Sequence, residues 1–242
     1  MAAVNLLQTR GLTRHFGGLR AVENVDFDLP EGQVRALIGP NGAGKTTFVG
    51  MLCGRIRATT GQVNFLGSDV TALAAHQRIS LGMAYTFQIT SVFASLSAHE
   101  NVALAARRRL GADGVQVDRE VVTALGKVGL TERADQVAGD LSYGHQRLLE
   151  IAMGLAQAPR LLILDEPTQG LADSEIDDFV ALIKSLKGET TILLIEHNMN
   201  VVMATADIIT VLNYGEILAE GSADDIRGNK AVQSAYLGTG DA

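Results

Sequence analysis

Short apolar runs recur along the chain, separated by longer segments in which apolar positions follow a helical period. Four runs are almost entirely aliphatic, at residues 34–38, 161–164, 191–195 and 208–212. A strand that is apolar at nearly every position has both faces buried, which is typical of a parallel sheet covered by helices. Helical periodicity between the runs, as at residues 174–186, fits the same arrangement. The pattern therefore predicts an α/β fold.

The first part of the chain has a different pattern. Residues 4–9, 19–29 and 62–66 predict strands, because apolar and polar positions alternate there and turn residues bound them. Residues 14–18, which end in two glycines, predict a turn that carries one aromatic side chain. We expect an antiparallel β patch in this region.

Helical spacing dominates the middle of the chain. It is found at residues 101–110, 119–128 and 145–156, with loops expected at 111–114 and 139–144. This predicts a mostly helical insertion.

A further strand is expected at residues 83–88, ahead of that insertion. With no internal repeat and no low-complexity linker, we expect one domain over residues 1–242. Its core would comprise residues 1–88 and 158–242, and residues 89–157 would form a helical lobe.

Composition narrows the class of protein. The chain has 242 residues and a net charge of −7, and it lacks the basic balance that a general nucleic-acid binder carries. No apolar run approaches the ~20 residues that a membrane span needs. The N-terminus shows no secretory signal pattern, and the single cysteine, Cys53, falls in an apolar stretch. We expect a cytoplasmic protein in which Cys53 is a buried core thiol.

A glycine-rich loop at residues 39–47 is the strongest candidate for chemistry. It fits the pattern G-x-x-x-x-G-K-[ST] and joins the apolar run 34–38 to a helix-compatible stretch at 48–53. Backbone N–H groups of such a loop and the start of a helix bind phosphate, and Lys45 would reach the outer phosphates. The hydroxyl of Thr46 would offer Mg²⁺ an oxygen ligand.

Two acidic residues, Asp165 and Glu166, end the apolar run 161–164. Their position predicts carboxylates at the carboxyl edge of the sheet, where α/β proteins bind ligands. Asp165 would bind Mg²⁺ directly or through water. Glu166 could polarise a water molecule for attack on a γ-phosphate.

A second anion site is indicated at residues 141–147, directly before a predicted helix. It would combine the hydroxyl of Ser142, the N–H of Gly144 and the start of that helix. The chain therefore carries two candidate phosphate sites.

Taken together, these residues resemble the nucleotide-binding subunit of an ABC transporter over essentially the whole chain. Residues 39–47 match the Walker A loop, 161–166 the Walker B strand and 141–147 the signature motif. The resemblance adds Gln88, as the Q-loop glutamine, and His197, as the switch histidine. It implies nucleotide contacts from Phe16, Gly39, Asn41, Gly42, Ala43, Gly44, Lys45, Thr46, Thr47 and Gln88.

The same resemblance implies the remaining roles. Glu166 and His197 would be catalytic. Mg²⁺ would be held by Thr46, Gln88 and Asp165. A second subunit, arranged head to tail, would contribute Ser142, Gly144 and His145 to the ATP, so that ATP joins the two subunits and hydrolysis separates them.

Further similarities, at residues 16–19, 146–152, 195–199 and 235–238, resemble the cassettes of branched-chain amino-acid importers and their urea or amide relatives. They imply ATP and Mg²⁺ as cofactors, a second related or identical ATPase subunit, two membrane permeases and, indirectly, a periplasmic solute-binding protein. The subunit would lie on the cytoplasmic face of the bacterial inner membrane, with no nucleic-acid partner.

Three positions depart from the family pattern. His145 replaces the usual glutamine of the signature, and Ala172 stands where many cassettes have an aspartate. Phe16 is the candidate for stacking on adenine, where tyrosine is more frequent; stacking needs only an aromatic face. The first two departures leave the contacts across the dimer open.

Other assignments stay open at this point. A cassette of an exporter or lipid transporter shares all five motifs. A soluble ABC ATPase of translation or DNA repair usually carries two cassettes or a coiled-coil insertion. If the chain were a P-loop kinase or GTPase, the match of residues 141–147 to the signature motif would be accidental. The sequence does not name the transported molecule.

Overall fold

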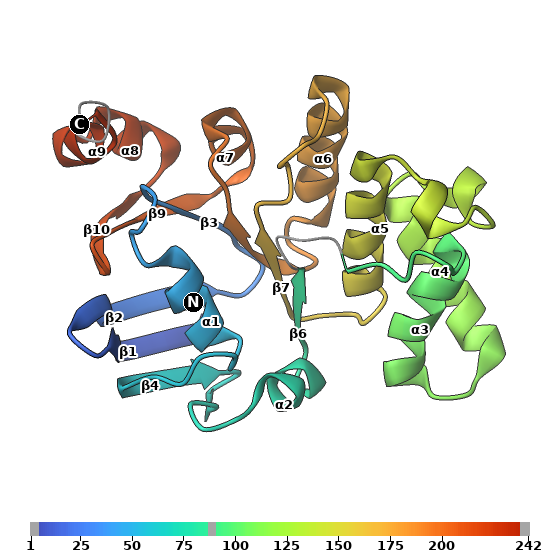
Figure 1. Ribbon diagram of the computed structural model, residues 1–242, viewed down its shortest axis with the longest axis horizontal. Helices are drawn as coiled ribbons and strands as arrows, with labels where there is room; N and C mark the ends of the chain where they lie inside the picture. The colour runs from blue at the N-terminus through green and yellow to red at the C-terminus, as the bar shows by residue number, and fades with distance from the viewer. Residues whose placement is uncertain (1–4, 87–90, 238–242) are drawn as a thin grey trace.

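The computed structural model describes residues 5–86 and 91–237. The group of helices lies at one end of the longest axis of the molecule, and the two sheets lie one below the other in the rest of it (Figure 1). The expected strand residues Phe87 and Gln88 lie outside the described residues, and so do residues 1–4 and 238–242.

The central sheet has six strands in the order β10-β9-β3-β8-β7-β6. All neighbours pair in parallel except β9 and β10, which form an antiparallel edge. The strands are β3 (Val34–Ile38), β6 (Met83–Thr86), β7 (Leu161–Asp165), β8 (Thr191–Ile195), β9 (Ile208–Asn213) and β10 (Glu216–Gly221). The predicted parallel sheet is confirmed.

Both faces of this sheet are buried, and the period of two along a strand sends alternate side chains to different cores. In β7, Leu162 and Leu164 pack in the core shared with the helices α3 to α6, whereas Leu161 and Ile163 pack in the core shared with α1 and the second sheet. The bounds of the flanking helices are α1 (Lys45–Leu52), α6 (Asp173–Leu186) and α7 (Met199–Thr205).

The second sheet is the expected antiparallel patch, in the order β2-β1-β4-β5. Its strands are β1 (Asn5–Phe16), β2 (Leu19–Pro30), β4 (Thr60–Phe65) and β5 (Ser68–Asp69). The turn expected at residues 14–18 is shorter than predicted. Arg14 still pairs with Val22 in the hairpin, and only Gly17 and Gly18 form the turn.

The helical insertion is also confirmed, and each of its three helices begins at a polar cap. The helices α3 (Ala98–Leu110), α4 (Gly114–Lys127) and α5 (Tyr143–Leu155) follow Ser97, Asp113 and Ser142, whose side chains each accept a backbone N–H of the first turn. They begin two to five residues earlier than predicted, because caps rather than apolar spacing fix a helix start.

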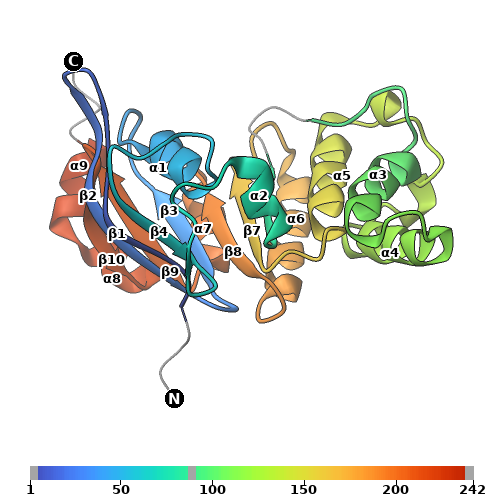
Figure 2. The ribbon, with the colours of Figure 1, turned by 90° about the horizontal axis from the view of Figure 1, so that it is seen from below.

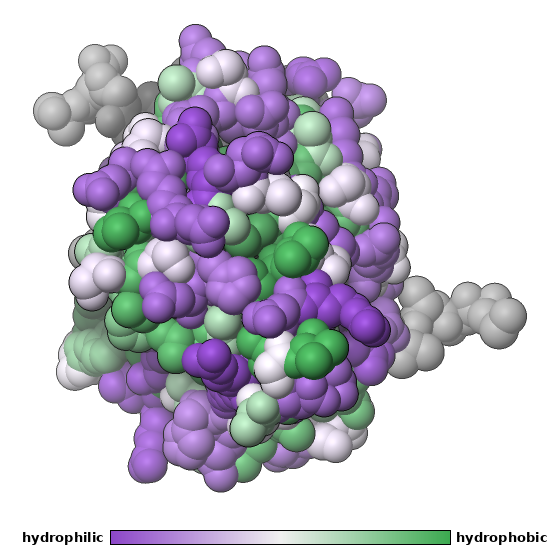
Figure 3. Space-filling view, turned by 90° about the vertical axis from the view of Figure 1, so that its right-hand side faces the viewer, coloured by the Kyte–Doolittle hydropathy of each residue, from purple (hydrophilic) through white to green (hydrophobic). Residues whose placement is uncertain are grey.

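The end of the molecule formed by α3 and α4 is mixed in character (Figure 3). Polar side chains cover most of it, with exposed apolar side chains between them, among them Leu104, Val115 and Val122. Scattered exposed apolar residues are normal on a protein surface. None of the helices in the described ranges is long and apolar enough to cross a bilayer.

The sequence analysis assigned no element after residue 212, no helix between residues 67 and 82, and none between residues 196 and 207. The structure adds α2 (Ala75–Ser80), α7, β10, α8 (Ala223–Gly228) and α9 (Lys230–Leu237). These elements have six to eight residues each. Such short segments contain at most about two helical turns, so they show little periodicity.

Candidate functional site

The glycine-rich loop connects β3 to α1 at the carboxyl edge of the central sheet. Two of its glycines meet neighbouring backbone so closely that no side chain fits. A Cβ on Gly39 would lie 2.1 Å from the carbonyl oxygen of Leu212, and a Cβ on Gly44 would lie 2.2 Å from that of Ala21. Gly44 also has a φ of 99°, which glycine adopts easily. The loop is thus wedged between β9 and β2.

Lys45, the first residue of α1, turns back over this loop. Its Nζ donates to the carbonyl oxygens of Gly39, at 2.6 Å, and Pro40, at 3.0 Å. The residue is buried, and burial lowers the pKa of its ammonium group, while the charges of Glu166 and Asp165 raise it. A desolvated ammonium group is thereby held where the loop N–H groups converge, which suits the binding of phosphate oxygens.

Asp165 ends β7 and is buried. Its Oδ2 accepts a hydrogen bond of 2.6 Å from the hydroxyl of Tyr85, on the adjacent strand β6. Burial raises the pKa of Asp165, and this hydrogen bond lowers it. Tyr85 was not singled out by the sequence, because only the pairing of β6 with β7 places it beside Asp165.

Glu166 and His197 lie side by side, one residue after the end of β7 and two residues after the end of β8. Glu166 Oε1 is 2.5 Å from His197 Nε2. The backbone of Glu166 has a φ of 50°, and its N–H donates to the carbonyl of Ile195 at 2.8 Å. A non-glycine residue in this left-handed region is held there by its surroundings. The strand ends therefore bring together the two residues that the family resemblance named as catalytic.

The glycine-rich loop and the Glu166–His197 pair line the same open cavity of about 400 Å³. It is lined by the seven loop and helix residues 41–47, by Glu166 and His197, and by Leu19, Arg20, Ala21 and Tyr214. The last four come from β2 and the β9–β10 turn, and the sequence analysis did not identify them. Antiparallel sheet, glycine loop and strand ends thus share one site.

Phe16 lies beside this cavity. It pairs with Leu19 at the end of the β1–β2 hairpin, and its side chain is 43% exposed. The guanidinium carbon of Arg14 stands 4.3 Å from the centre of the Phe16 ring. One face of the ring is therefore covered by a cation.

The signature residues form the start of α5 and do not line the cavity of the same chain. Figure 2 shows α5 well separated from α1, the helix that follows the glycine-rich loop. Ser142 Oγ accepts the N–H of His145 at 3.2 Å and lies 3.0 Å from His145 Nδ1. A Cβ on Gly144 would meet the carboxylate of Glu175 at 2.2 Å, so a larger residue here would displace that side chain from its hydrogen bond to the N–H of Ala172. Ala172 is the N-cap residue of α6. Gln88 lies outside the described residues.

Comparisons with known proteins agree with this geometry. A model of the ABC transporter family matches residues 22–169, and one of the branched-chain amino acid ATP-binding cassette transporters matches residues 216–242. The chain is 41% identical over 249 residues to the high-affinity branched-chain amino acid transport ATP-binding protein BraF of Pseudomonas aeruginosa, covering 96% of this chain and 98% of that protein. It is 39% identical over 250 residues to LivG of Escherichia coli, described in the same words, with the same coverage.

Solved structures show the same fold. The ATP-binding cassette MJ1267 of an ABC transporter matches with a TM-score of 0.88 and 26% identity, over 96% of this chain and 99% of that one. Its ADP conformation matches with a TM-score of 0.86 and 26% identity, over 97% and 99% of the two chains.

The loop between β3 and α1 and the acidic end of β7 define a P-loop NTPase. The chain belongs to the ABC transporter family, in which it is an ATP-binding subunit and an ATPase. The fold class and family inferred from the sequence are thus confirmed. The kinase and GTPase alternative is excluded.

Proposed function

We propose that this chain is the ATPase subunit of an importer for branched-chain amino acids or related small solutes. Support comes from its identity to BraF and LivG over nearly their whole lengths and from the match of its C-terminal residues 216–242. An exporter or lipid-transporter cassette would share the nucleotide site, but those relatives and that C-terminal match favour import.

One observation carries the proposed chemistry: Lys45, Glu166 and His197 converge on a single cavity at the carboxyl edge of a parallel sheet. Lys45 and the loop N–H groups bind the β- and γ-phosphates of ATP. Glu166 accepts a proton from the attacking water as the water oxygen bonds to the γ-phosphorus, and the bond between that phosphorus and the β-phosphate oxygen breaks to release ADP. His197 holds the Glu166 carboxylate and faces the leaving phosphate. Phe16, beside the cavity, stacks on the adenine.

The residues also fit a magnesium ion. Thr46 supplies a hydroxyl and Asp165 a buried carboxylate, and Mg²⁺ prefers such hard oxygen donors, with water and phosphate oxygens completing its shell. Asp165 directly precedes Glu166, which lines the cavity together with Lys45, so this carboxylate lies near the phosphate cradle. Bound there, the ion would neutralise charge developing on the phosphates; Gln88 is a further proposed ligand.

The assembly follows from the separation of the two anion sites. The α5 start with Ser142, Gly144 and His145 lies apart from the Lys45 cavity of its own chain, so we assign it to the ATP of a second, head-to-tail subunit. Residues 89–157 would be the helical lobe of a single domain 1–242 that contacts the permeases. Two permeases and a periplasmic binding protein would complete the importer, with this subunit peripheral to the inner membrane.

Release of phosphate from MgATP by the purified chain tests the site. We expect Lys45→Ala to weaken nucleotide binding and Glu166→Gln to abolish hydrolysis while binding persists. Binding measured with a fluorescent ATP analogue separates the two effects. Rapid hydrolysis by Glu166→Gln would refute its assignment, and co-purification of the wild type with membrane proteins would identify the permeases.

A further inference from the structure

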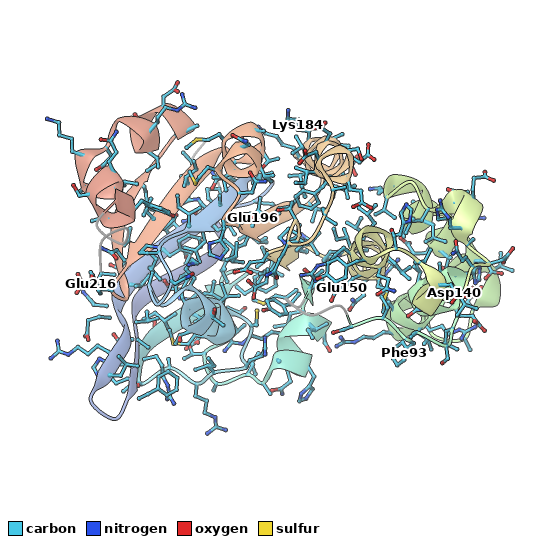
Figure 4. All side chains as sticks on the ribbon, turned by 45° about the horizontal axis from the view of Figure 1, so that its top comes forward. Phe93, Asp140, Glu150, Lys184, Glu196 and Glu216 are labelled. Carbon is cyan, nitrogen blue, oxygen red and sulfur yellow. The ribbon has the colours of Figure 1, made fainter. Side chains whose placement is uncertain are left out.

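A buried carboxylate that the family resemblance does not assign lies directly beside the proposed catalytic pair. Glu196 stands between the end of β8 and His197, in the middle of the molecule (Figure 4). It is 3% exposed, yet the structure gives it no cationic partner among its hydrogen bonds within the described residues. A buried charge without such a partner needs its hydrogen bonds to be satisfied by other groups.

Four donors surround this carboxylate. Oε1 accepts the backbone N–H of Thr168 at 3.0 Å and also the hydroxyl of Thr168. Oε2 accepts the backbone N–H groups of His197, at 2.7 Å, and Asn198, at 2.9 Å. Each oxygen therefore binds a different segment of the chain.

These two segments carry the proposed catalytic residues. Thr168 follows Glu166 by two positions, and His197 supplies its own N–H to Oε2. The sheet pairing of β7 with β8 ends at Asp165 and Ile195, and only the N–H of Glu166, which donates to Ile195, extends it. Beyond that point, the Glu196 carboxylate joins the turn after β7 to the turn after β8.

We propose that Glu196 is a positioning residue for ATP hydrolysis, which holds the turn carrying Glu166 in register with the backbone of His197. This inference rests on the proposed roles of those two residues. Glu196 does not line the cavity; its carboxylate bonds Thr168 and the backbone N–H of His197. Its loss should therefore affect the hydrolytic step more than the binding of nucleotide.

The chemistry of the site favours a carboxylate over an amide. A carboxylate only accepts hydrogen bonds, and both of its oxygens can serve several donors. In a glutamine at this position, the NH₂ group would face either the Thr168 donors or the two backbone N–H groups. One turn would then lose its attachment, even though the side chain keeps its size.

The test compares Glu196→Gln with Glu220→Gln. Glu220, on the distant edge strand β10, is the control: its Oε1 also accepts a threonine hydroxyl, that of Thr210 on β9 at 2.6 Å, but it additionally pairs with Arg35. For Glu196→Gln we expect kcat to fall about 10- to 100-fold, while the KM for MgATP stays within about threefold. Glu220→Gln should retain kcat within about twofold. Thermal unfolding of both variants reports any loss of stability.

Thr168 offers a milder probe that does not alter a buried charge. Thr168→Val removes the hydroxyl donor and keeps the backbone one, so kcat should fall by about three- to tenfold, and Thr168→Ser should restore it. If Glu196→Gln fails to fold, the two Thr168 variants test whether the Glu196–Thr168 contact supports hydrolysis.

Two outcomes would overturn the inference. One is an unchanged kcat in Glu196→Gln or, where that variant does not fold, in Thr168→Val. The other is a parallel loss of kcat, nucleotide affinity and thermal stability, which would mean that Glu196 only maintains the fold. A failure of the proposed function is distinguishable, because the wild-type chain would then release no phosphate from MgATP.

Discussion

A hydrogen bond from the half-buried Tyr85 influences the charge of Asp165, the proposed metal ligand. The Tyr85 hydroxyl donates to Asp165 Oδ2 over 2.6 Å. Burial and this carboxylate raise the pKa of Tyr85 well above its usual value, so the phenol stays protonated and keeps its donor. Burial likewise raises the pKa of Asp165, and the hydrogen bond from Tyr85 opposes that rise. Tyr85 thus favours the ionised carboxylate.

We therefore expect Tyr85→Phe to make Asp165 harder to ionise. The pKa of Asp165 would rise further, so the acidic limb of kcat/KM against pH would move to higher pH. A hydrogen bond to a charged group contributes about 1.5–3 kcal/mol, which corresponds to an order of magnitude or more in kcat/KM below that limb. ATPase rates between about pH 5 and 8, at several Mg²⁺ concentrations, measure the shift. An unmoved limb would exclude Tyr85 from this role.

The residues of the site differ in how far the sequence could predict them. Lys45 lies in a local motif whose loop and helix follow directly from the order of the residues. Glu166 was predicted from its position at the end of an apolar run, His197 was named from the family resemblance, and the structure brings them together. Tyr85 and Glu196 act through contacts 80 and 28 positions along the chain. Those contacts depend on which strands are neighbours, which the pattern of apolar positions does not specify.

At the scale of elements, a buried arginine caps the C-terminal end of α1, the helix that follows the phosphate loop. Arg78, on α2, donates from Nη1 to the carbonyl oxygens of Met51 and Leu52 at the end of α1. Its other nitrogens donate to Leu73 and Thr71. The carbonyl groups at the end of a helix have no partners within it, and a cation there also interacts favourably with the helix dipole.

Removal of this arginine should destabilise the fold substantially. Arg78→Leu leaves buried carbonyl groups without donors, and we expect the free energy of unfolding to fall by about 2–4 kcal/mol. The exposed Arg108 is the control, because it also donates to a main-chain carbonyl, that of His76 on α2, at 3.0 Å. Arg108→Leu should change stability by less than about 1 kcal/mol. Urea unfolding measures both, and equal losses would contradict a capping role for Arg78.

Prediction of the elements succeeded where burial is strongest. The four strands β3, β7, β8 and β9 are apolar on both faces and were predicted within one residue of their observed ends. The edge strand β10 was missed because it is half exposed, and antiparallel pairing with β9 determines its conformation. Similarly, α8 packs on β9 and β10 with only Ile226 buried on it. The conformations of β10 and α8 are therefore determined by tertiary contacts rather than by the local pattern of apolar residues.

On the scale of the whole molecule, each chain has two halves of a phosphate site that do not meet. Lys45 lines one cavity, and Ser142, at the start of α5, is not part of that cavity. In the proposed arrangement, an ATP bound by Lys45 of one chain alone would leave part of its γ-phosphate in contact with solvent. Two chains in a head-to-tail arrangement would complete both sites at once, because such an interface repeats the same contact twice.

Dimerisation should therefore require bound ATP and should be lost when that ATP is hydrolysed. We expect Glu166→Gln to run at twice the 25.6 kDa monomer mass in light scattering with MgATP, and as a monomer without nucleotide or with ADP. A double variant that adds Ser142→Arg should bind ATP yet stay monomeric, because a cation and its bulk would occupy the partner's phosphate contact. If Glu166→Gln is monomeric at every ATP concentration while binding the nucleotide, the second subunit is a different chain, and adding that chain should restore the ATP-dependent dimer.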